Sequence, residues 1–445
     1  MRMKGVAATI AALCLTATAL SACAGPGSSG PVEVEFWHSM TGAANGPTLD
    51  TIISQYNALP ENQGKVTVKG VFQGTYDELI AKYKAAAQTG GTPTMSQVYD
   101  IGSRFMIDSG TITPMQNFID AEKFDVSDIQ PNVAGYYTID SKLYSMPFNT
   151  SVPVFYYNKD VFKKAGLDPE KPPTTIAEIR AAAEQIKAKN AAQYPFTAAI
   201  YGWLVEQEIA ANGDLYCSPD NGRGSGSATQ MSFDNPNAVE FIQWWDQMVA
   251  DGLSTNIGRD TQQAQQVFSS GASGMTLEST GALGGFVKTA QFEVGVGFYP
   301  KVKPSDFGPA IGGASIWIMG KDHSEAEQQA AWGFVKYLSS PEVQAQWHVS
   351  TGYFPISKGA LNQPADVEYR NTVPQFNVAV DQLSSTKLTT ATQGCAAGIM
   401  PQSRKAVEDA LEKVLTTDAD AQATLTAAAQ SVTTLLTEYN QSVGK

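Results

Sequence analysis

Runs of alternating apolar residues along the chain predict β-strands, and runs with an apolar residue every three or four positions predict α-helices. Residues 32–37 (VEVEFW) alternate as a half-buried strand does, and the apolar residues of 49–59 recur at helical spacing. A second strand is expected at 66–69 and a second helix at 76–87. This alternation of strands and helices predicts an α/β fold around a largely parallel sheet.

The middle and the end of the chain continue this pattern. A strand is expected around Pro153, which places it at a sheet edge or a crossing point because proline cannot donate to a strand ladder. Thr175 and Glu178 have the spacing of a capping box at a helix start. Late strands are expected at 295–299 and 315–319.

The first residues have a different character from the rest. Residues 5–20 are apolar or small, follow Arg2 and Lys4, and lead through further small residues to Cys23. This is the pattern of an export signal, and the run is too short for a good membrane span. A cysteine directly after such a segment resembles the lipobox of bacterial lipoproteins. That resemblance implies that residues 1–22 are removed and that the thiol of Cys23 is acylated; a plain cleaved signal peptide is the alternative.

The segment 23–31 continues as a Gly/Ser/Pro linker, which suits a folded body held away from a membrane surface. With 445 residues, the chain is long enough for two lobes. Its formal net charge of −13 makes it a poor partner for nucleic acids and anionic lipids.

Chemistry that would indicate an enzyme is absent from the sequence pattern. The three histidines, His38, His323 and His348, are far apart, and no spacing typical of a metal site, nucleophile elbow or phosphate-binding loop is present. We therefore expect no catalytic residue, no metal and no cofactor. Cys217 and Cys395 remain after the leader, and in an oxidising compartment they are expected either to form a disulfide or to stay as two buried thiols.

Several short segments together resemble the extracellular solute-binding proteins of bacterial ABC importers, within the carbohydrate-binding family and its glycerol-phosphate branch. The tyrosine-rich strand and KKAGLDP are shared widely by sugar binders, whereas FWHSM, GGASIW and MPQSR in this order are more specific to that branch. The segments that carry the resemblance are 36–40, 74–76, 97–100, 147–151, 156–160, 164–169, 312–317, 351–353 and 400–404.

The resemblance implies a two-lobe α/β fold of the periplasmic-binding-protein type, with a hinge and a central ligand cleft. We expect residues 32–143 and 291–340 to form the first lobe. Residues 144–290 and 341–445 are expected to form the second.

It also implies a set of ligand-binding residues. Arg404 is the expected cation for a phosphate group, because a guanidinium offers a fork of donors that matches phosphate oxygens. Asp100 is expected to accept from glycerol hydroxyls, and Trp203 to form an apolar wall. Thr280 takes the place of Ser279 if the match is displaced by one residue. The full expected set is Tyr76, Asp100, Ser151, Trp203, Ser279, Gly313, Tyr353 and Arg404.

One position departs from the family pattern and bears on specificity. Ile200 stands where the glycerol-3-phosphate branch has a first tryptophan, while Trp203 keeps the second. A smaller wall admits an extended head group such as choline, which favours aromatic faces and a nearby acid. The sequence therefore favours a glycerophosphodiester over bare glycerol-3-phosphate.

These expectations combine into one function. The chain is expected to be an extracytoplasmic, lipid-anchored monomer that binds glycerophosphocholine or sn-glycerol-3-phosphate and delivers it to transmembrane permease subunits. The first alternative is a receptor for a neutral sugar or oligosaccharide, which needs aromatic platforms and no essential arginine. The second is a secreted phosphodiesterase, which the missing catalytic motifs disfavour.

Overall fold

The computed structural model describes residues 30–224, 226–417 and 419–445. The expected signal segment 1–22 and Cys23 lie outside the described residues, as does most of the expected linker. Within the described part of the chain, no helix is both long and apolar enough to span a bilayer.

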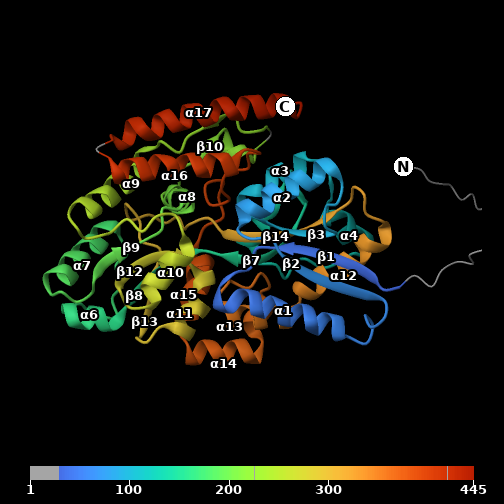
Figure 1. The fold of residues 1–445 in the computed structure, drawn as a ribbon, viewed down its shortest axis with the longest axis horizontal. Helices are drawn as coiled ribbons and strands as arrows, with labels where there is room; N and C mark the ends of the chain where they lie inside the picture. Colours follow the sequence, from blue (N-terminus) through green and yellow to red (C-terminus); the bar gives the residue numbers. More distant parts are fainter. Residues whose placement is uncertain (1–29, 225, 418) are drawn as a thin grey trace, which may run out of the picture.

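The first sheet occupies one side of the molecule and has the order β2-β1-β3-β14-β4, with β7 also paired to β14 (Figure 1). Strands β1, β2 and β3 are parallel, whereas β14 runs antiparallel to its neighbours β3, β4 and β7. The bounds are β1 Val32–His38, β2 Val66–Phe72, β3 Met95–Tyr99, β4 Ile112–Thr113, β7 Met146–Ser151 and β14 Gly312–Met319.

The second sheet has the order β13-β8-β12-β9 and lies on the other side of the molecule (Figure 1). Its central strands, β8 and β12, are buried along almost their whole length. The bounds are β8 Pro153–Asn158, β9 Tyr194–Thr197, β12 Ser273–Ser279 and β13 Val294–Phe298; the short hairpin strands are β5 Thr138–Ile139, β6 Lys142–Leu143, β10 Cys217–Ser218 and β11 Gln230–Met231.

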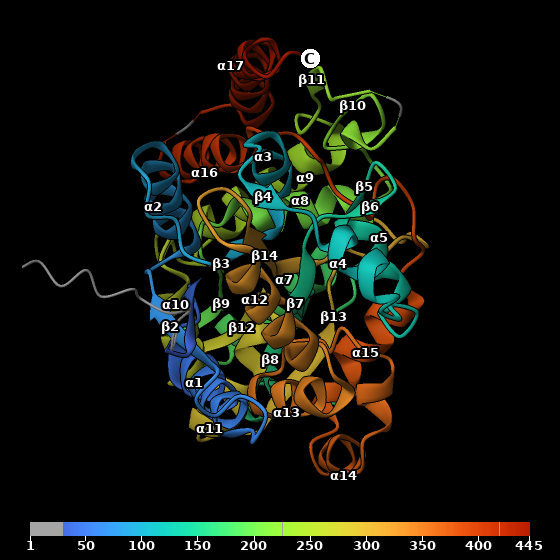
Figure 2. The same cartoon turned by 90° about the vertical axis from the view of Figure 1, so that its right-hand side faces the viewer.

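Helices cover both sheets. Figure 2 shows α2 and α3 on one side of the first sheet and α1, α12 and α13 on the other. Helices α8, α9, α16 and α17 pack together beside the second sheet. The helices are α1 Gly42–Ala58, α2 Tyr76–Thr89, α3 Ser103–Asp108, α4 Met115–Glu122, α5 Pro131–Tyr137, α6 Lys159–Ala165, α7 Ile176–Ala188, α8 Gly202–Ala211, α9 Pro236–Ala250, α10 Thr261–Ser269, α11 Leu283–Thr289, α12 Glu325–Leu338, α13 Pro341–Thr351, α14 Pro364–Thr372, α15 Gln375–Ser385, α16 Met400–Thr416 and α17 Ala421–Ser442, with short 3₁₀ turns η1 Asp100–Gly102, η2 Asp220–Gly222, η3 Thr280–Ala282 and η4 Gly359–Asn362.

Strand pairing corrects two of the expected lobe boundaries. The segment 291–340 was assigned to the first lobe, but β13 within it pairs with β8 of the second sheet. The segment 144–290 was assigned to the second lobe, but β7 within it pairs with β14 of the first sheet. The chain therefore crosses between the sheets at 151–153 and again at 299–311, because each crossing follows the last paired residue of a strand.

The hydrophobic core extends across the junction between the sheets. One buried cluster contains Val98 of β3 together with Phe155 of β8, and another contains Phe36 of β1 together with Tyr156 of β8. The two lobes are therefore packed against each other in this structure.

Candidate ligand-binding site at the lobe junction

Arg404 lies in the second turn of α16 and is buried between the lobes, with 4% of its surface exposed. Its Nε and Nη2 atoms donate to the two carboxylate oxygens of Glu206 on α8, at 2.6 and 2.8 Å. Gly202, at the start of α8, allows this approach, because a Cβ there would lie 2.7 Å from the backbone oxygen of Arg404. The arginine and Glu206 thus belong to one packed pair of helices.

Asp100 reaches Arg404 from the other lobe. It begins the short turn η1, which directly follows β3 of the first sheet. Arg404 Nη2 donates to Asp100 Oδ2 at 2.9 Å, and Nη1 lies 3.4 Å from both Asp100 Oδ1 and the hydroxyl of Tyr201. All five N–H groups of the guanidinium are thus directed at protein oxygens, and the Asp100 pair joins the lobes.

The charges of this cluster influence one another strongly. Burial opposes the charge of Arg404, but the neighbouring Asp100 and Glu206 outweigh it and hold the pKa of the guanidinium well above its usual value. Burial raises the pKa of Glu206, while the charge of Arg404 opposes that rise. One cation therefore faces two carboxylates, and their formal charges leave the cluster without excess positive charge.

Tyr76 is fixed at the first residue of α2 by the capping box around it. Thr75 Oγ1 accepts from the backbone N–H of Glu78, and Glu78 in return accepts from the N–H of Thr75. The Tyr76 ring stacks on Tyr99 with centroids 5.4 Å apart, and its hydroxyl accepts from Asn149 at 2.8 Å. The Tyr99 ring in turn lies 5.8 Å from the Arg404 guanidinium, which connects Tyr76 to the ionic cluster.

Tyr353 meets the same group from the loop after α13. Its hydroxyl interacts with Tyr76 and Asn149, and its ring stacks on Trp347. Burial raises the pKa of both tyrosine hydroxyls, so both are neutral donors near pH 7. Gly281 faces this ring closely, because a Cβ there would lie 2.6 Å from it.

The strands β7 and β14 bring three further predicted positions to the junction. Ser151 is paired with Gly312, and Gly313 follows with a φ of +90°. A Cβ on Gly313 would lie 1.9 Å from the backbone oxygen of Asn149, so only glycine fits this bulged pairing. The ring of Trp203 packs directly on Gly312, which places the expected apolar wall against the backbone of β14.

Ser279 and Ile200 lie further from the arginine. Ser279 ends β12, and its hydroxyl accepts from the backbone N–H of Gly281 at 3.1 Å, which puts it beside Tyr353. Thr280, the alternative to Ser279, is buried and instead accepts from Val152 at 3.3 Å. Ile200 is 1% exposed and lies in the same core as Trp203.

A small cavity lies next to the ionic cluster. Its volume is about 20 Å³, and its walls include Asp100, Glu206, Tyr136, Tyr216 and Cys395. A space of this size accommodates about one water molecule. A solute much larger than water does not fit this space while the lobes are packed together.

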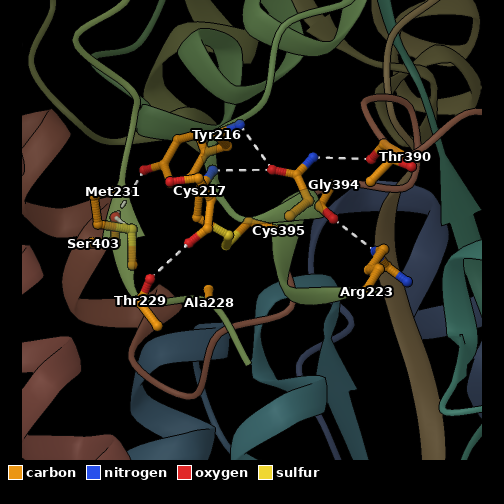
Figure 3. Close-up of a disulfide and its surroundings, with 12 residues drawn as sticks. Tyr216, Cys217, Arg223, Ala228, Thr229, Met231, Thr390, Gly394, Cys395 and Ser403 are labelled. Atoms are coloured by element: carbon orange, nitrogen blue, oxygen red, sulfur yellow. Dashed lines mark hydrogen bonds between the residues drawn. A yellow bond between two sulfur atoms is a disulfide. The ribbon is translucent and has the colours of Figure 1, made fainter. Parts of the chain in front are cut away.

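The cavity wall is anchored by a disulfide between Cys217 and Cys395 (Figure 3). Beside it, Arg223 Nε donates to the carbonyl oxygen of Gly394 at 2.7 Å, and Nη1 donates to that of Tyr136 at 2.9 Å. Burial lowers the pKa of Arg223 to about 10, which leaves it cationic at neutral pH. The disulfide segment thus brings a second cation to the lobe junction.

The structure brings the eight predicted positions into one connected region, but it changes the surroundings of two. Asp100 was expected to receive glycerol hydroxyls and Arg404 to receive phosphate; here they bind each other. Glu206, Tyr201 and Asn149 were not among the predicted positions. Asn149 lies inside a quoted motif, whereas the signal for Glu206 is its place in the polar run 206–208 of a mostly apolar helix. Among the described residues, no group of His, Cys, Asp and Glu is arranged to hold a metal ion.

Comparison with known proteins finds relatives over nearly the whole chain. A family model described as bacterial extracellular solute-binding protein matches residues 51–375. The sn-glycerol-3-phosphate-binding periplasmic protein UgpB of Yersinia pestis is 36% identical over 419 residues, which are 92% of this chain and 93% of the relative. UgpB of Pectobacterium atrosepticum is 33% identical over 440 residues, covering 97% of this chain and 96% of that protein.

Solved structures have the same fold. UgpB from Mycobacterium tuberculosis in complex with glycerophosphocholine matches with a TM-score of 0.78 at 22% identity, over 93% of this chain and 99% of that one. The cyclic α-maltosyl-1,6-maltose binding protein from Arthrobacter globiformis matches with a TM-score of 0.71 at 25% identity, over 92% and 99%. The family and the two-lobe fold expected from the motifs are confirmed.

Proposed function

Because this chain belongs to the bacterial extracellular solute-binding proteins, we propose that it is the binding protein of an ABC importer for a glycerophosphodiester, such as glycerophosphocholine, or for sn-glycerol-3-phosphate. Relatives that bind solutes indicate a binding role at family level rather than an enzymatic one. The ligand is held between the lobes and is released unchanged.

The observation that carries this proposal is the buried Arg404 at the lobe junction. A guanidinium that is reached by α8 of one lobe and by η1 of the other lies where a cleft would close on a phosphate. When the lobes separate, Asp100 leaves with its own lobe and frees two N–H groups of Arg404. Those groups match the paired oxygens of a phosphate.

The neighbouring residues support a ligand with a polar head and an apolar flank. Tyr76 and Tyr353 offer neutral hydroxyl donors, and Trp203 offers an aromatic face. Asp100 and Glu206 supply negative charge near aromatic rings, which suits a quaternary ammonium group. Together with the smaller Ile200, this environment favours the phosphodiester over the phosphomonoester.

The location and partners follow from the same proposal. The pattern that ends in Cys23 supports a protein that is exported and held at the cell membrane by lipid. We propose that the receptor acts as a monomer and docks on transmembrane permease subunits. Closure around the ligand is a shift in population toward the state that binds it better.

A sugar receptor is the second candidate, because the Arthrobacter globiformis protein with this fold is a maltosyl-maltose binding protein. A neutral sugar accepts hydrogen bonds from a guanidinium but, unlike a phosphate, has no charge that the cation attracts. The ionic cluster at Arg404 therefore favours a phosphate-containing ligand.

Isothermal titration of the purified protein against glycerophosphocholine, sn-glycerol-3-phosphate and maltose tests the proposal. Saturable binding of glycerophosphocholine, with weaker binding of sn-glycerol-3-phosphate, is the expected result. Binding of sn-glycerol-3-phosphate alone would keep the receptor function but remove the role given to Ile200. Heat with maltose alone would overturn the phosphate site. Recovery of intact glycerophosphocholine after incubation is expected, since a phosphodiesterase would cleave it.

A further inference from the structure

Glu206 occupies one complete edge of the Arg404 guanidinium. Both of its carboxylate oxygens accept, one from Nε at 2.6 Å and the other from Nη2 at 2.8 Å. This two-point contact fixes the plane and the rotation of the guanidinium. The edge that remains, formed by Nη1 and Nη2, is the one that faces Asp100.

Glu206 and Asp100 differ in the lobe that carries them. Glu206 stands on α8, which packs against the α16 of Arg404, and the N–H of Gly202 on α8 donates to Glu408 of α16 at 3.0 Å. Asp100 stands on η1 of the other lobe. Separation of the lobes therefore removes Asp100 from the arginine but leaves Glu206 in place.

This difference sets the charge that an entering ligand meets. With Asp100 withdrawn, Arg404 and Glu206 have formal charges that cancel. Glu408, 17% exposed at its side chain, interacts with the arginine and adds negative charge, although it also faces Arg259 at 4.0 Å. A phosphomonoester carries nearly two negative charges at neutral pH, whereas a phosphodiester carries one. Because Glu206 already balances the charge of Arg404, the second negative charge of the monoester is attracted only weakly. When the lobes close, the carboxylate of Asp100 approaches the phosphate and repels that charge.

We infer that Glu206 is a specificity-determining residue: it positions the Nη edge of Arg404 for the ligand and lowers the preference of the site for a doubly charged phosphomonoester relative to a singly charged phosphodiester. This inference rests on the proposed function. It explains why a receptor for a phosphate compound pairs its principal arginine with two carboxylates, one buried and one 11% exposed at its side chain.

The test is titration of wild type and of Glu206→Gln with sn-glycerol-3-phosphate and glycerophosphocholine. The amide keeps the shape of Glu206 but removes its charge. We expect the ratio of the two dissociation constants to move about tenfold in favour of sn-glycerol-3-phosphate, the order expected from removing one nearby like charge at an intermediate effective dielectric. Glu206→Asp, which keeps the charge, should retain the wild-type ratio.

Glu208→Gln is the matched control. Glu208 is on the same helix and is also buried, but its carboxylate accepts from Val302 and Asn212 instead of from Arg404. Its ratio of dissociation constants should equal that of wild type. An equal change of both affinities in Glu206→Gln would mean that Glu206 is only structural, and would overturn the inference.

If Glu206→Gln does not fold, a measurement on the wild-type protein still tests the inference. Glycerophosphoglycerol is a phosphodiester with an uncharged head group, so it separates the charge of the phosphate from the choline. Wild type should bind it more tightly than sn-glycerol-3-phosphate. Loss of the diester preference with this ligand would place the selectivity in the choline and overturn the role of Glu206. Failure of wild type to bind any of the three phosphates would overturn the proposed function itself.

Discussion

At the crossing segments the lobes are joined by uncharged hydrogen bonds, whereas at Arg404 they are joined by an ion pair. Gln382 of α15 accepts from the backbone N–H of Tyr299 at 2.6 Å and donates to the carbonyl oxygen of Pro153 at 2.7 Å. It therefore ties the crossings 151–153 and 299–311 to one helix. Both regions are buried: Gln382 is 3% exposed and Arg404 is 4% exposed.

The difference between the two regions indicates which contacts move. The Gln382 bonds hold two segments where the chain itself passes between the lobes, so they can persist when the lobes rotate about those segments. The Asp100–Arg404 bond joins two residues that are far apart in the sequence and belong to different lobes. Separation of the lobes must therefore break it. The cost of desolvation cancels much of the attraction in a buried ion pair. Breaking this bond therefore costs little free energy when the lobes stay folded and water or ligand replaces the lost contact.

Arg404→Ala should have the largest effect, because Arg404 is, within the described part of the chain, the one cation that pairs with both Asp100 and Glu206. Leaving buried carboxylates without their partner costs about 3–5 kcal/mol. We expect a fall of that order in the free energy of unfolding, measured by urea titration, and loss of glycerophosphocholine binding in calorimetry.

Arg259→Ala provides the control for this variant. Arg259 also pairs with α16, with Asp409 at 2.8 Å and with Glu412, but its side chain is 32% exposed. Exposed ion pairs contribute at most about 1 kcal/mol. Similar losses of stability in the two variants would show that burial of Arg404 has no special importance.

Gln382→Ala should have the next largest effect. It leaves the N–H of Tyr299 and the carbonyl of Pro153 buried without this partner, which costs about 2–3 kcal/mol for the two groups together. Urea unfolding measures this loss. The preference between glycerophosphocholine and sn-glycerol-3-phosphate should stay unchanged, because no charge near Arg404 is altered.

Gln375→Ala, on the same helix, is the control. It tests whether the loss of stability comes from the contacts with the crossing segments or from a general disturbance of α15. Gln375 donates to the carbonyl oxygen of Val294 at 2.9 Å and is only half-buried. Its loss should cost less than that of Gln382. A changed ligand preference in Gln382→Ala would contradict the division of roles between the two regions.

The sequence was sufficient for the class of fold but not for the partners of each strand. Alternation identified the segment 295–299 as a strand, and the structure has β13 at Val294–Phe298. Its place beside β8 depends on contacts with residues more than 130 positions earlier, which local patterns do not encode. The same reason explains β7: the segment 146–151 was not predicted as a strand, and its pairing with β14 joins residues more than 160 positions apart.

The candidate site could be predicted where a motif contains the residue. Tyr76, Asp100, Ser151 and Arg404 all lie in quoted motifs, and the structure brings them to one junction. Glu206 could not be assigned this way, since it lies outside every motif and contacts Arg404 across 198 residues. Its partner is set by the packing of α8 against α16, which no local pattern encodes.

The smallest expected effect comes from Glu208, which holds the crossing segment by accepting from the N–H of Val302 at 2.6 Å. Burial raises the pKa of Glu208 to about 7. A carboxyl with a raised pKa in the folded state favours unfolding as the pH rises above its unfolded value, near 4.3, toward 7. Glu208→Gln does not titrate, so its stability relative to wild type should increase by about 1 kcal/mol between pH 6 and pH 7.5. Urea unfolding at both values measures this difference; a constant difference would show that Glu208 is already ionised at pH 6 and that the crossing segments, like Arg404, are held by a charge.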